Sequence, residues 1–364
     1  MKRILVVATR QIGDVLLTTP LIRAARERWP ESQIEVVGFS GTLGILRGNP
    51  DINRVIELPL RLGWSGFRAL TRQIWRRYDL ALITQPGDRA HLIGWIAART
   101  RSGIVPAEGK SNWLKRSLLA HAVESAGDRG KVHVVAEKLS LLTPWLDTAR
   151  SAPRVVLPTA DALPNEVEAQ LTPDVIVIHV PSMWSYKQWP VQHYRLLAGE
   201  LLDRGWQIIL TGSASARDRE CIAPLLTLAS APQLLDLSGQ LDFNQLATLF
   251  GKAKLYIGPD TSVSHLAAAA GLPVIAIFGP TNPLRWRPWP AEAPVKSFFV
   301  RRAPVQSEGN VTVLQEASMG CVPCGRAGCD DHLQSRSDCL QAITPQRVLT
   351  QALAELESNS QNRA

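Results

Sequence analysis

The sequence predicts an α/β protein made of two doubly wound halves, each with a parallel sheet that is covered on both faces. Short continuous apolar runs of strand length alternate with amphipathic helical stretches, a pattern typical of buried parallel sheets. This alternation stops in a proline-rich stretch and then restarts. The 364 residues also exceed the roughly 150 residues of one typical domain. Two domains are therefore expected.

The first half begins with a buried strand, after which helices and strands alternate. The expected elements are a strand at Ile4–Ala8, a helix at Val15–Trp29 that Pro30 ends, a strand at Ile34–Gly38, a helix at Phe67–Tyr78 and a strand at Leu80–Thr84. Apolar residues in the later helix share one face at helical spacing and are expected to pack on the sheet: Phe67, Leu70, Ile74, Trp75 and Tyr78.

The second half repeats this pattern after four prolines between Ser151 and Asp174. Its expected strands are Val175–Val180, Ile208–Thr211, Leu255–Gly258 and Val274–Phe278. We therefore expect an N-terminal Rossmann-like domain at 1–160 and a C-terminal one at 161–344. A final helix at 345–357 follows, with Pro345 at its first position.

Composition and charge narrow the kind of protein. With 40 Lys and Arg against 32 Asp and Glu, the net charge is +8, which favours an acidic partner. The longest candidate membrane span, Leu266–Thr281, contains two glycines and two prolines and is shorter than the roughly 18–20 apolar residues required. The opening apolar run, Ile4–Ala8, is too short for a signal-peptide core. A cytoplasmic protein is expected.

Common nucleotide and nucleic-acid motifs are missing from the sequence. No G-x-G-x-x-G follows a predicted strand, and the glycines of Gly103–Ser111 are spaced wrongly for a P-loop. No recognised nucleic-acid motif accompanies the positive charge, so nucleic acid is not an expected partner.

The first loop with chemical interest, Arg10–Pro20, directly follows the opening strand and contains Gly13 and Asp14. Open parallel sheets bind their ligands at the carboxyl ends of strands. Asp14 is therefore a candidate catalytic residue. The alternative is that it only caps the first helix.

A second polar loop, Pro259–Ala269, lies between a strand and an alanine-rich helix. Hydroxyl groups and backbone N–H groups at a helix N-terminus suit a diphosphate. The alternative is a capped turn, although the loop has more polar chemistry than a cap requires. Its candidate binding residues are Asp260, Thr261, Ser262, Ser264 and His265.

Two further loops follow predicted strands. Pro181–Pro190 places Lys187 among aromatic residues, where its ammonium group would act as a point charge against phosphate. Phe278–Thr281 follows the last predicted strand, with Trp286 and Pro288 beyond it.

These segments, in this order and spacing, resemble glycosyltransferase family nine, the ADP-heptose:lipopolysaccharide heptosyltransferases. The resemblance runs from IGDVLLTTP through KQWP, LTGS, GPDTSVSHLAAAAGLPVIAIFGPT and WRPWP to a cysteine-rich C-terminal segment. It implies the GT-B fold, in which two Rossmann-like domains face each other across a cleft and the final helix returns towards the first domain. It also implies an inverting transfer of heptose from ADP-heptose to the lipopolysaccharide inner core, at the cytoplasmic face of the inner membrane.

The resemblance also implies roles for individual residues. Asp14 would be the general base, and Gly13 beside it would take part in binding the donor. Lys187 would contact the donor phosphates. The sugar-nucleotide site would be lined by Asp260, Thr261, Ser262, Ser264 and His265. Gly212 and Ser213 would approach the nucleotide, and Asp218 its ribose. Ser262 stands where the family commonly has glycine, so its side chain either crowds the diphosphate or adds a hydroxyl contact.

Physical reasoning adds two expectations about the reaction. A single carboxylate base without a covalent intermediate would invert the anomeric configuration. Lys187 and the N–H groups near Thr261 would stabilise the departing diphosphate without a metal. The alternatives are a family-nine enzyme with another nucleotide sugar or acceptor, and a GT-B protein that binds nucleotide sugar without transferring it.

Basic residues crowd the first half of the chain. Arg68, Arg72, Arg76 and Arg77 are expected on the outer face of the helix at 67–78, and Arg61, Lys110, Lys115 and Arg116 lie in the same half. Either they form a solvated helix face or they bind acceptor phosphates or an anionic lipid leaflet. The resemblance implies a lipid A core acceptor. No heptad indicates an oligomer, so a monomer is the default.

Four of the five cysteines lie close together near the C-terminus, at Cys321, Cys324, Cys329 and Cys339. Clustered thiols in a reducing compartment favour structural zinc over disulfides. The spacing, however, is not that of paired Cys-x2-Cys ligands. Structural zinc and free thiols both remain open, and no cofactor is expected to be required for the reaction.

Overall fold

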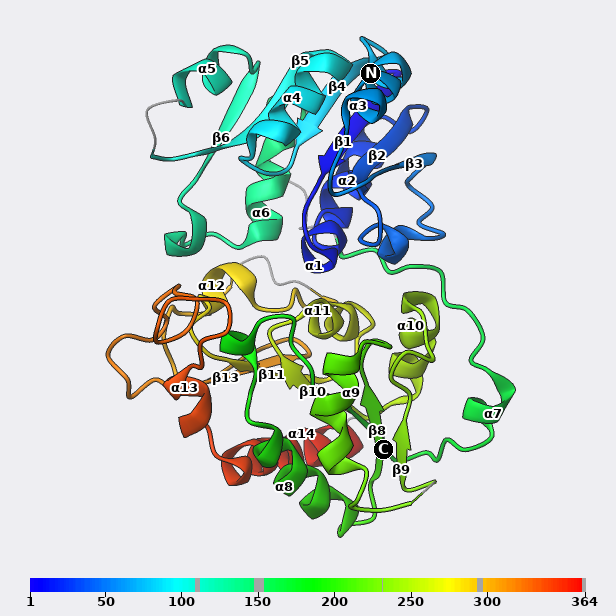
Figure 1. The fold of residues 1–364 in the computed structure, drawn as a ribbon, viewed down its shortest axis with the longest axis vertical. Helices are drawn as coiled ribbons and strands as arrows, with labels where there is room; N and C mark the ends of the chain where they lie inside the picture. Colours follow the sequence, from blue (N-terminus) through cyan, green and yellow to red (C-terminus); the bar gives the residue numbers. More distant parts are fainter. Residues whose placement is uncertain (109–111, 147–153, 231, 293–296, 362–364) are drawn as a thin grey trace. The chain divides into compact units, whose positions relative to one another are not determined.

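Two separate sheets, one in each half of the chain, form the framework of the structure (Figure 1). The structure is a computed structural model that describes residues 1–108, 112–146, 154–230, 232–292 and 297–361. It divides into one unit at Met1–Pro158 and another at Thr159–Ala364. This division falls close to the boundary expected at residue 160.

The first unit is built on a six-stranded parallel sheet of order β3-β2-β1-β4-β5-β6. Its strands are β1 (Arg3–Ala8), β2 (Gln33–Phe39), β3 (Arg54–Leu58), β4 (Tyr78–Ile83), β5 (Ala98–Pro106) and β6 (His121–Ser125). Its helices are α1 (Ile12–Leu16), α2 (Thr19–Arg28), α3 (Trp64–Ile74), α4 (Asp88–Ala97), α5 (Asn112–Ser117) and α6 (Val134–Leu139). The order changes direction between β1 and β4, as in doubly wound folds.

The second unit has a seven-stranded sheet of order β12-β13-β11-β10-β7-β8-β9, in which only the β12–β13 pair is antiparallel. Its strands are β7 (Val175–His179), β8 (Gln207–Thr211), β9 (Leu234–Asp236), β10 (Leu255–Pro259), β11 (Val274–Phe278), β12 (Val305–Glu308) and β13 (Val311–Gln315). Its helices are α7 (Asn165–Glu168), α8 (Val191–Leu202), α9 (Ala216–Ile222), α10 (Phe243–Lys252), α11 (Ser262–Ala269), α12 (Pro283–Trp286), α13 (Asp338–Ala342) and α14 (Pro345–Gln361).

Both sheets are buried on both faces, which confirms the predicted α/β architecture. Apart from Arg3 and His179 at their ends, the central strands β1, β7 and β10 are buried runs of apolar residues, as expected when helices cover both faces of a parallel sheet. On one face of the first sheet, Leu70 and Ile74 of α3 pack in the same core as Ile93 and Ile96 of α4. Within the described residues, no helix combines the length and apolar character needed to cross a membrane.

The helix predicted at Val15–Trp29 is two helices, α1 and α2, separated at Leu17 and Thr18. The Thr18 hydroxyl donates to the carbonyl oxygen of Asp14 at 2.8 Å. Pro20 then lies at the start of α2, where its missing N–H group does no harm. In the interior of one continuous helix the same proline would remove a hydrogen bond.

The helix predicted at Phe67–Tyr78 ends earlier, at Ile74. Arg76 has a φ of 51°, and Tyr78 is the first residue of β4. The Tyr78 hydroxyl donates to Glu35 Oε2 at 2.8 Å inside the unit, and burial raises its pKa. Trp75, expected to pack on the sheet, is 51% exposed. A contact with distant Glu35 therefore takes Tyr78 into the sheet.

The final helix packs within the second unit. Val348, Leu349, Ala352 and Leu356 of α14 are buried in the core of the second unit, where α14 packs on α8. The expected return of this helix towards the first domain stays a prediction. The apolar face of α14 is used within the unit that contains it.

Candidate functional site

The second sheet brings four predicted loops to one edge. Strands β11, β10, β7 and β8 are consecutive neighbours in the sheet, and the loops that follow them contain Thr281, Asp260, Lys187 and Ser213. The strand order changes direction between β7 and β10. Ligands of open α/β sheets bind at such a point.

Lys187 and Asp260 meet at this switch point, from the loops after β7 and β10. Lys187 Nζ lies 2.6 Å from Asp260 Oδ2. The Asp260 side chain is 7% exposed and the Lys187 side chain 22%, so the lysine is the more accessible member of the pair. An ammonium group held in place by a buried carboxylate is preorganised to meet an incoming phosphate.

The KQWP segment holds Lys187 in position. The Gln188 amide donates to the Val180 carbonyl at 2.7 Å and accepts from the Ser182 N–H at 2.8 Å. Trp189 is fully buried, and its indole N–H donates to the Ile343 carbonyl at 2.9 Å. Gln188 therefore ties the loop back to the end of β7, and Trp189 ties it to the segment before α14. Both contacts restrict the position of Lys187, which precedes them.

Helix α11 begins at Ser262, directly after Asp260 and Thr261. Thr261 is its N-cap residue but makes no side-chain cap hydrogen bond, so the simple capped-turn alternative does not describe this segment. Thr261 and Ser262 are partly exposed at an end whose first backbone N–H groups lack partners within the helix. This end suits an anion.

Two of the predicted donor-binding residues in α11 are buried. Ser264 is 0% exposed, and its hydroxyl donates to the Pro259 carbonyl at 2.5 Å and lies 3.0 Å from the Tyr256 hydroxyl. In this structure the hydroxyl stabilises the turn from β10 into α11, and the expected donor contact of Ser264 stays a prediction. His265 is 6% exposed. The accessible candidates here are Thr261 and Ser262.

The loop after β8 contains Gly212 and Ser213, and Asp218 lies in the first turn of α9 directly after it. Both the N–H and the hydroxyl of Ser213 donate to Asp218 Oδ2 at 2.7 Å. A Cβ atom on Gly212 would lie 3.0 Å from Ile222 and 3.3 Å from Pro181, which explains the absence of a side chain. Asp218 shapes the loop in this structure, and its expected ribose contact is untested.

His179, the last residue of β7, is buried beside the candidate loops, and no sequence pattern indicated it as a site residue. Its Nδ1 lies 3.0 Å from Thr211 Oγ1, which ends β8. Burial lowers the pKa of His179 to about 4, so the imidazole is neutral at physiological pH. A lone buried histidine inside an apolar strand gives no signal in the sequence.

In the first unit, Asp14 occupies the third position of α1, after β1 and beside the point where the strand order reverses. The N-cap of α1 is Gln11, so Asp14 does not cap this helix. Its side chain is 16% exposed, and Arg10 Nη1 lies 4.0 Å from Asp14 Oδ1. Gly13, which precedes it, is partly exposed.

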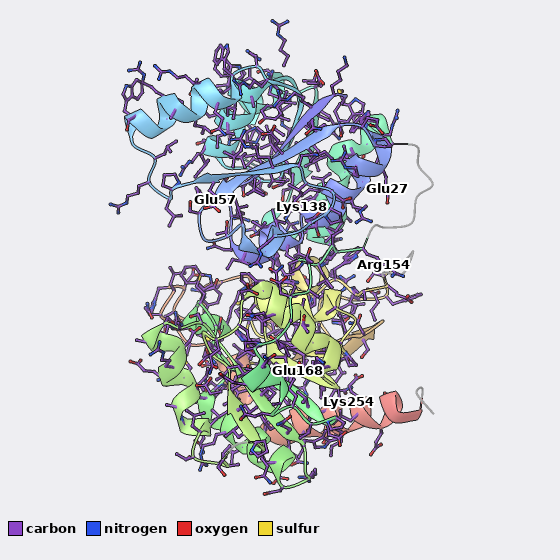
Figure 2. The ribbon with its side chains drawn as sticks, turned by 90° about the vertical axis from the view of Figure 1, so that its right-hand side faces the viewer. Glu27, Glu57, Lys138, Arg154, Glu168 and Lys254 are labelled. Carbon is purple, nitrogen blue, oxygen red and sulfur yellow. The ribbon has the colours of Figure 1, made fainter. Side chains whose placement is uncertain are left out.

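Lys138 of α6 contacts Asp14 of α1, and the sequence did not predict this contact. Its side chain is 3% exposed, and its ammonium group donates to the Asp14 carbonyl oxygen at 2.6 Å. The same nitrogen lies 3.9 Å from Asp14 Oδ1. Figure 2 labels Lys138 within the first unit. This contact joins residues 124 positions apart, which is why no local pattern predicted it.

The basic residues do not form the single helix face that was expected. Arg68 and Arg72 are exposed on α3, and Arg61 lies in the loop before it. Arg76 lies beyond the helix, with its guanidinium 5.7 Å from the Trp75 ring and 5.6 Å from the Trp95 ring. Lys115 is paired with Asp88 at 2.6 Å and Arg116 with Glu124 at 2.7 Å. Lys110 lies outside the described residues.

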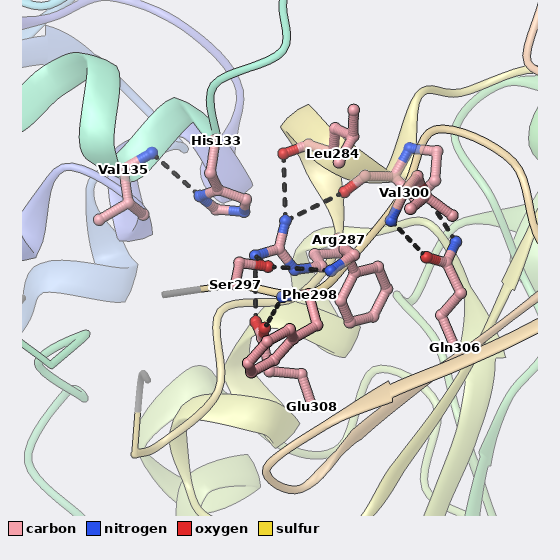
Figure 3. Close-up of polar contacts among 11 residues, drawn as sticks. His133, Val135, Leu284, Arg287, Ser297, Phe298, Val300, Gln306 and Glu308 are labelled. Carbon is pink, nitrogen blue, oxygen red and sulfur yellow. Dashed lines mark hydrogen bonds and ion pairs between the residues drawn. The ribbon is translucent and has the colours of Figure 1, made fainter. Parts of the chain in front are cut away.

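The WRPWP segment contributes a buried ion pair (Figure 3). The Arg287 guanidinium donates to Glu308 Oε2 at 3.1 Å and to the Ser297 hydroxyl at 2.8 Å. Both charged side chains are almost fully buried, at 3% and 6% exposure. Arg287 also stacks 4.5 Å above the Phe299 ring. This part of the motif serves the fold of the second unit.

All five cysteines are free thiols. The described residues contain no group of three or more His, Cys, Asp or Glu arranged to hold a metal. Cys339 is buried, and burial together with the nearby Cys324, Cys329 and Cys321 raises its pKa to about 12. Cys329 Sγ accepts the N–H of Asp338 at 3.4 Å. Structural zinc and free thiols both stay predictions, which metal analysis of the purified protein tests.

The cysteine segment borders the edge of the sheet that carries Lys187. The Ser337 hydroxyl donates to the Tyr186 carbonyl at 2.7 Å. The Gly325 N–H donates to the Pro280 carbonyl at 2.9 Å. The segment therefore supports two of the four candidate loops.

Each unit is a doubly wound α/β unit with polar loops at its switch point. Comparison with known proteins gives the family. The model for glycosyltransferase family 9 (heptosyltransferase) matches residues 67–311, and the chain belongs to this family. It is therefore an enzyme of the glycosyltransferase class, as the sequence predicted.

Individual relatives agree with this assignment. The chain is 27% identical to lipopolysaccharide heptosyltransferase 3 of Escherichia coli over 76% of its length and 83% of that protein. It is 27% identical to lipopolysaccharide heptosyltransferase 1 of Pseudomonas aeruginosa over 97% of its length and 98% of the relative. The solved structure of E. coli ADP-heptose lps heptosyltransferase II matches with a TM-score of 0.70 and 22% identity, over 99% of this chain and 100% of that one. At this identity the structural match shows a shared fold.

Proposed function

We propose that this protein is an inverting heptosyltransferase that transfers heptose from ADP-heptose to the lipopolysaccharide inner core. The relatives named above support heptose as the sugar and lipopolysaccharide as the acceptor. The observation that carries the donor assignment is the Lys187–Asp260 pair beside the start of α11. Together they offer an ammonium group and helix N–H groups to a diphosphate.

The second unit would stabilise the leaving group. As the bond between the anomeric carbon and the diphosphate oxygen breaks, negative charge grows on ADP. Lys187 and the N–H groups at Thr261 and Ser262 are already oriented, so they stabilise this charge with little reorganisation. These donors supply the positive potential that a metal provides in other transferases. We therefore propose that the reaction requires no metal.

The first unit would supply the base. Asp14 removes the proton from the acceptor hydroxyl as its oxygen attacks the anomeric carbon. A positioned base contributes typically about 10²–10⁴-fold to such a step. Lys138 holds the backbone carbonyl of Asp14 at 2.6 Å, which makes it a positioning residue. A direct displacement by the acceptor hydroxyl inverts the anomeric centre.

The experiment is acceptor-dependent ADP release from ADP-heptose, with Kdo₂–lipid A or a heptosylated core as acceptor. Asp14→Asn should lower kcat by about 10²-fold or more, with little change in donor affinity. Glu57→Gln is the matched control, because Glu57 is an exposed carboxylate of the same unit (Figure 2). Release that survives Asp14→Asn would remove Asp14 as the base and retain the transferase.

Two alternatives give different results in the same assay. A family-nine enzyme with another donor would release nucleotide from a UDP- or GDP-sugar and leave ADP-heptose intact. A nucleotide-sugar-binding protein would bind ADP-heptose and release nothing with either acceptor. The presence of both Asp14 and Lys187 favours catalysis over binding alone.

Because the proposed acceptor is a lipid, we also propose that the protein works at the cytoplasmic face of the inner membrane. We further propose that it is a monomer. The arginines of the first unit were expected to bind either acceptor phosphates or an anionic leaflet. Arg68 and Arg72 lie on the helix that also carries exposed Trp64. This setting favours the leaflet.

A further inference from the structure

One surface of the first unit combines exposed apolar side chains with exposed arginine side chains. We call it the α3–α4 surface and define it by Leu60, Trp64, Arg68, Arg72, Leu92 and Trp95. Trp64 is 76% exposed and Leu60 72%. Leu92 and Trp95 lie one turn apart on the outer face of α4 and are 44% and 37% exposed.

These outward side chains are not needed for the packing of their helices. Leu70 and Ile74 already bury the inner face of α3 against the sheet, and Ile93 and Ile96 do the same for α4. The two helices contact each other side by side on that sheet. The exposed tryptophans and leucines therefore form a second apolar face, directed away from the core.

A pocket of about 400 Å³ opens between the two helices. Its lining is largely apolar and is supplied by Leu62, Trp64, Phe67, Leu70, Leu92 and Ile93. Arg89 closes one side, where its guanidinium donates to the carbonyls of Pro59 and Leu60 at 3.0 and 2.8 Å. These two bonds hold the Leu60 loop at the rim. The volume lies within the range of small-molecule pockets.

The segment that contains α3 carries charge of one sign only. From residue 58 to residue 78 there is no Asp or Glu, whereas there are five arginines: Arg61, Arg68, Arg72, Arg76 and Arg77. The acidic residue that opens α4, Asp88, is paired with Lys115 at 2.6 Å. The surface therefore presents net positive charge around its apolar residues.

Tryptophan, leucine and arginine on one solvent-facing surface match the chemistry of a lipid–water interface. Tryptophan rings favour the headgroup level of a bilayer. Basic residues near the surface are attracted to anionic lipids. A wholly apolar partner would satisfy the apolar residues but would leave the arginines without opposite charge.

We propose that the α3–α4 surface is the membrane-contact surface of this protein. Arg68 and Arg72 contact anionic headgroups, Leu60 and Trp64 enter the boundary between headgroups and acyl chains, and a lipid chain enters the pocket. The proposal rests on the proposed function only in its choice of a membrane as the partner. It requires neither donor nor acceptor to be bound.

The test measures binding of the full-length protein to vesicles, without substrates. Vesicles of phosphatidylethanolamine with phosphatidylglycerol are compared with vesicles of the zwitterionic lipid phosphatidylcholine. Leu60→Ser combined with Trp64→Ser should weaken binding to the anionic vesicles by about tenfold or more, which is about 1.4 kcal/mol. Arg68→Gln combined with Arg72→Gln should remove most of the preference for anionic vesicles. Phe298→Ser is the matched control, because Phe298 is 81% exposed in the other unit.

A direct readout of depth separates insertion from loose adsorption. Lipids brominated on the acyl chain should quench the tryptophan fluorescence of the wild type more than that of Trp64→Phe. Equal vesicle binding by the wild type and the Leu60/Trp64 variant would overturn the proposal. So would an equal loss in Phe298→Ser, or equal quenching in Trp64→Phe.

Activity distinguishes this proposal from the proposed function. The Leu60/Trp64 and Arg68/Arg72 variants should lose transfer to an acceptor embedded in vesicles but keep it with a deacylated, water-soluble acceptor. A loss with both acceptors in the arginine variant would assign Arg68 and Arg72 to acceptor phosphates and overturn their role here. Vesicle binding without any heptose transfer would refute the proposed function and leave the membrane surface in place.

Discussion

Replacement of Lys187 by methionine tests whether the Lys187–Asp260 pair both stabilises the second unit and binds the donor. Methionine keeps most of the side-chain volume and removes the charge. It leaves the Asp260 carboxylate, 7% exposed, without the ammonium group that lies 2.6 Å away. Loss of one partner from a fully buried pair costs about 3–5 kcal/mol. Because Lys187 is itself 22% exposed, solvent screens part of this effect, and we expect a loss of about 2–3 kcal/mol.

Urea unfolding measures this loss in free energy, and two further variants interpret it. Lys187→Met combined with Asp260→Asn removes both charges and should recover most of the lost stability. Lys252→Met is the matched control. Lys252 Nζ also lies 2.6 Å from its partner, Glu168, but both side chains are well exposed, at 42% and 48%. Exposed pairs contribute about 0–1 kcal/mol, so the control should be close to wild type.

The same variants give a second, independent readout through ADP binding. A hydrogen bond to a charged group is worth about 1.5–3 kcal/mol, so Lys187→Met should weaken ADP binding about ten- to a hundredfold. The double variant should not recover that affinity, although it recovers stability. A stability loss below about 0.5 kcal/mol would show that the pair does not stabilise the unit. Normal ADP affinity in Lys187→Met would refute the donor role.

Three other predictions follow from buried groups. The pKa of His179 is lowered from 6.5 to about 4, so the unfolded chain binds a proton before the folded one does. The contribution of neutral His179 to the free energy of unfolding is complete above pH 6.5. It is lost as the pH falls towards 4, by about 2.5 kcal/mol at pH 4.5. Urea unfolding above pH 6.5 and at pH 4.5 should therefore show a smaller loss of stability in His179→Gln than in the wild type, and an equal loss in both proteins would contradict this. Arg287→Met leaves the buried Glu308 unpaired and should cost about 3–5 kcal/mol, most of which Arg287→Met with Glu308→Gln should restore; an equally unstable double variant would contradict the pairing. The thiols of Cys321, Cys324 and Cys329 are exposed and should react with a thiol reagent faster than that of buried Cys339. The raised pKa of Cys339, about 12, disfavours its thiolate. About one tightly bound zinc per chain, with all four thiols protected, would instead indicate a structural zinc site.

Much of the candidate site could be located from the sequence because its residues directly follow strands. Apolar runs of strand length identified β1, β7, β8, β10 and β11, and chain order alone placed Asp14, Lys187, Ser213 and Asp260 at their ends. In a parallel sheet all such ends lie at one edge. The meeting of Lys187 and Asp260 is a consequence of this rule, since β7 and β10 are neighbours.

The failures share a different physical cause. The predicted pattern at 67–78 had helical spacing throughout, yet Tyr78 pairs with Glu35, 43 residues away, and joins the sheet. Arg76 was expected on that helix but lies between two tryptophans, one of which comes from α4. In both places a tertiary contact outweighed a local preference, and helix propensity differs too little between residues to prevent it.

What the sequence by itself determined about this protein is the α/β class, the two halves, the family resemblance and the loops that carry polar chemistry. These properties depend on periodicity and on order along the chain. The tertiary structure decided which side chains within those loops remain accessible. It turned the Ser264 hydroxyl inward to Pro259, placed Lys138 beneath Asp14 and buried the face of α14 in the second unit. Accessibility depends on what other segments bury, and that arises only when residues far apart in the chain come into contact.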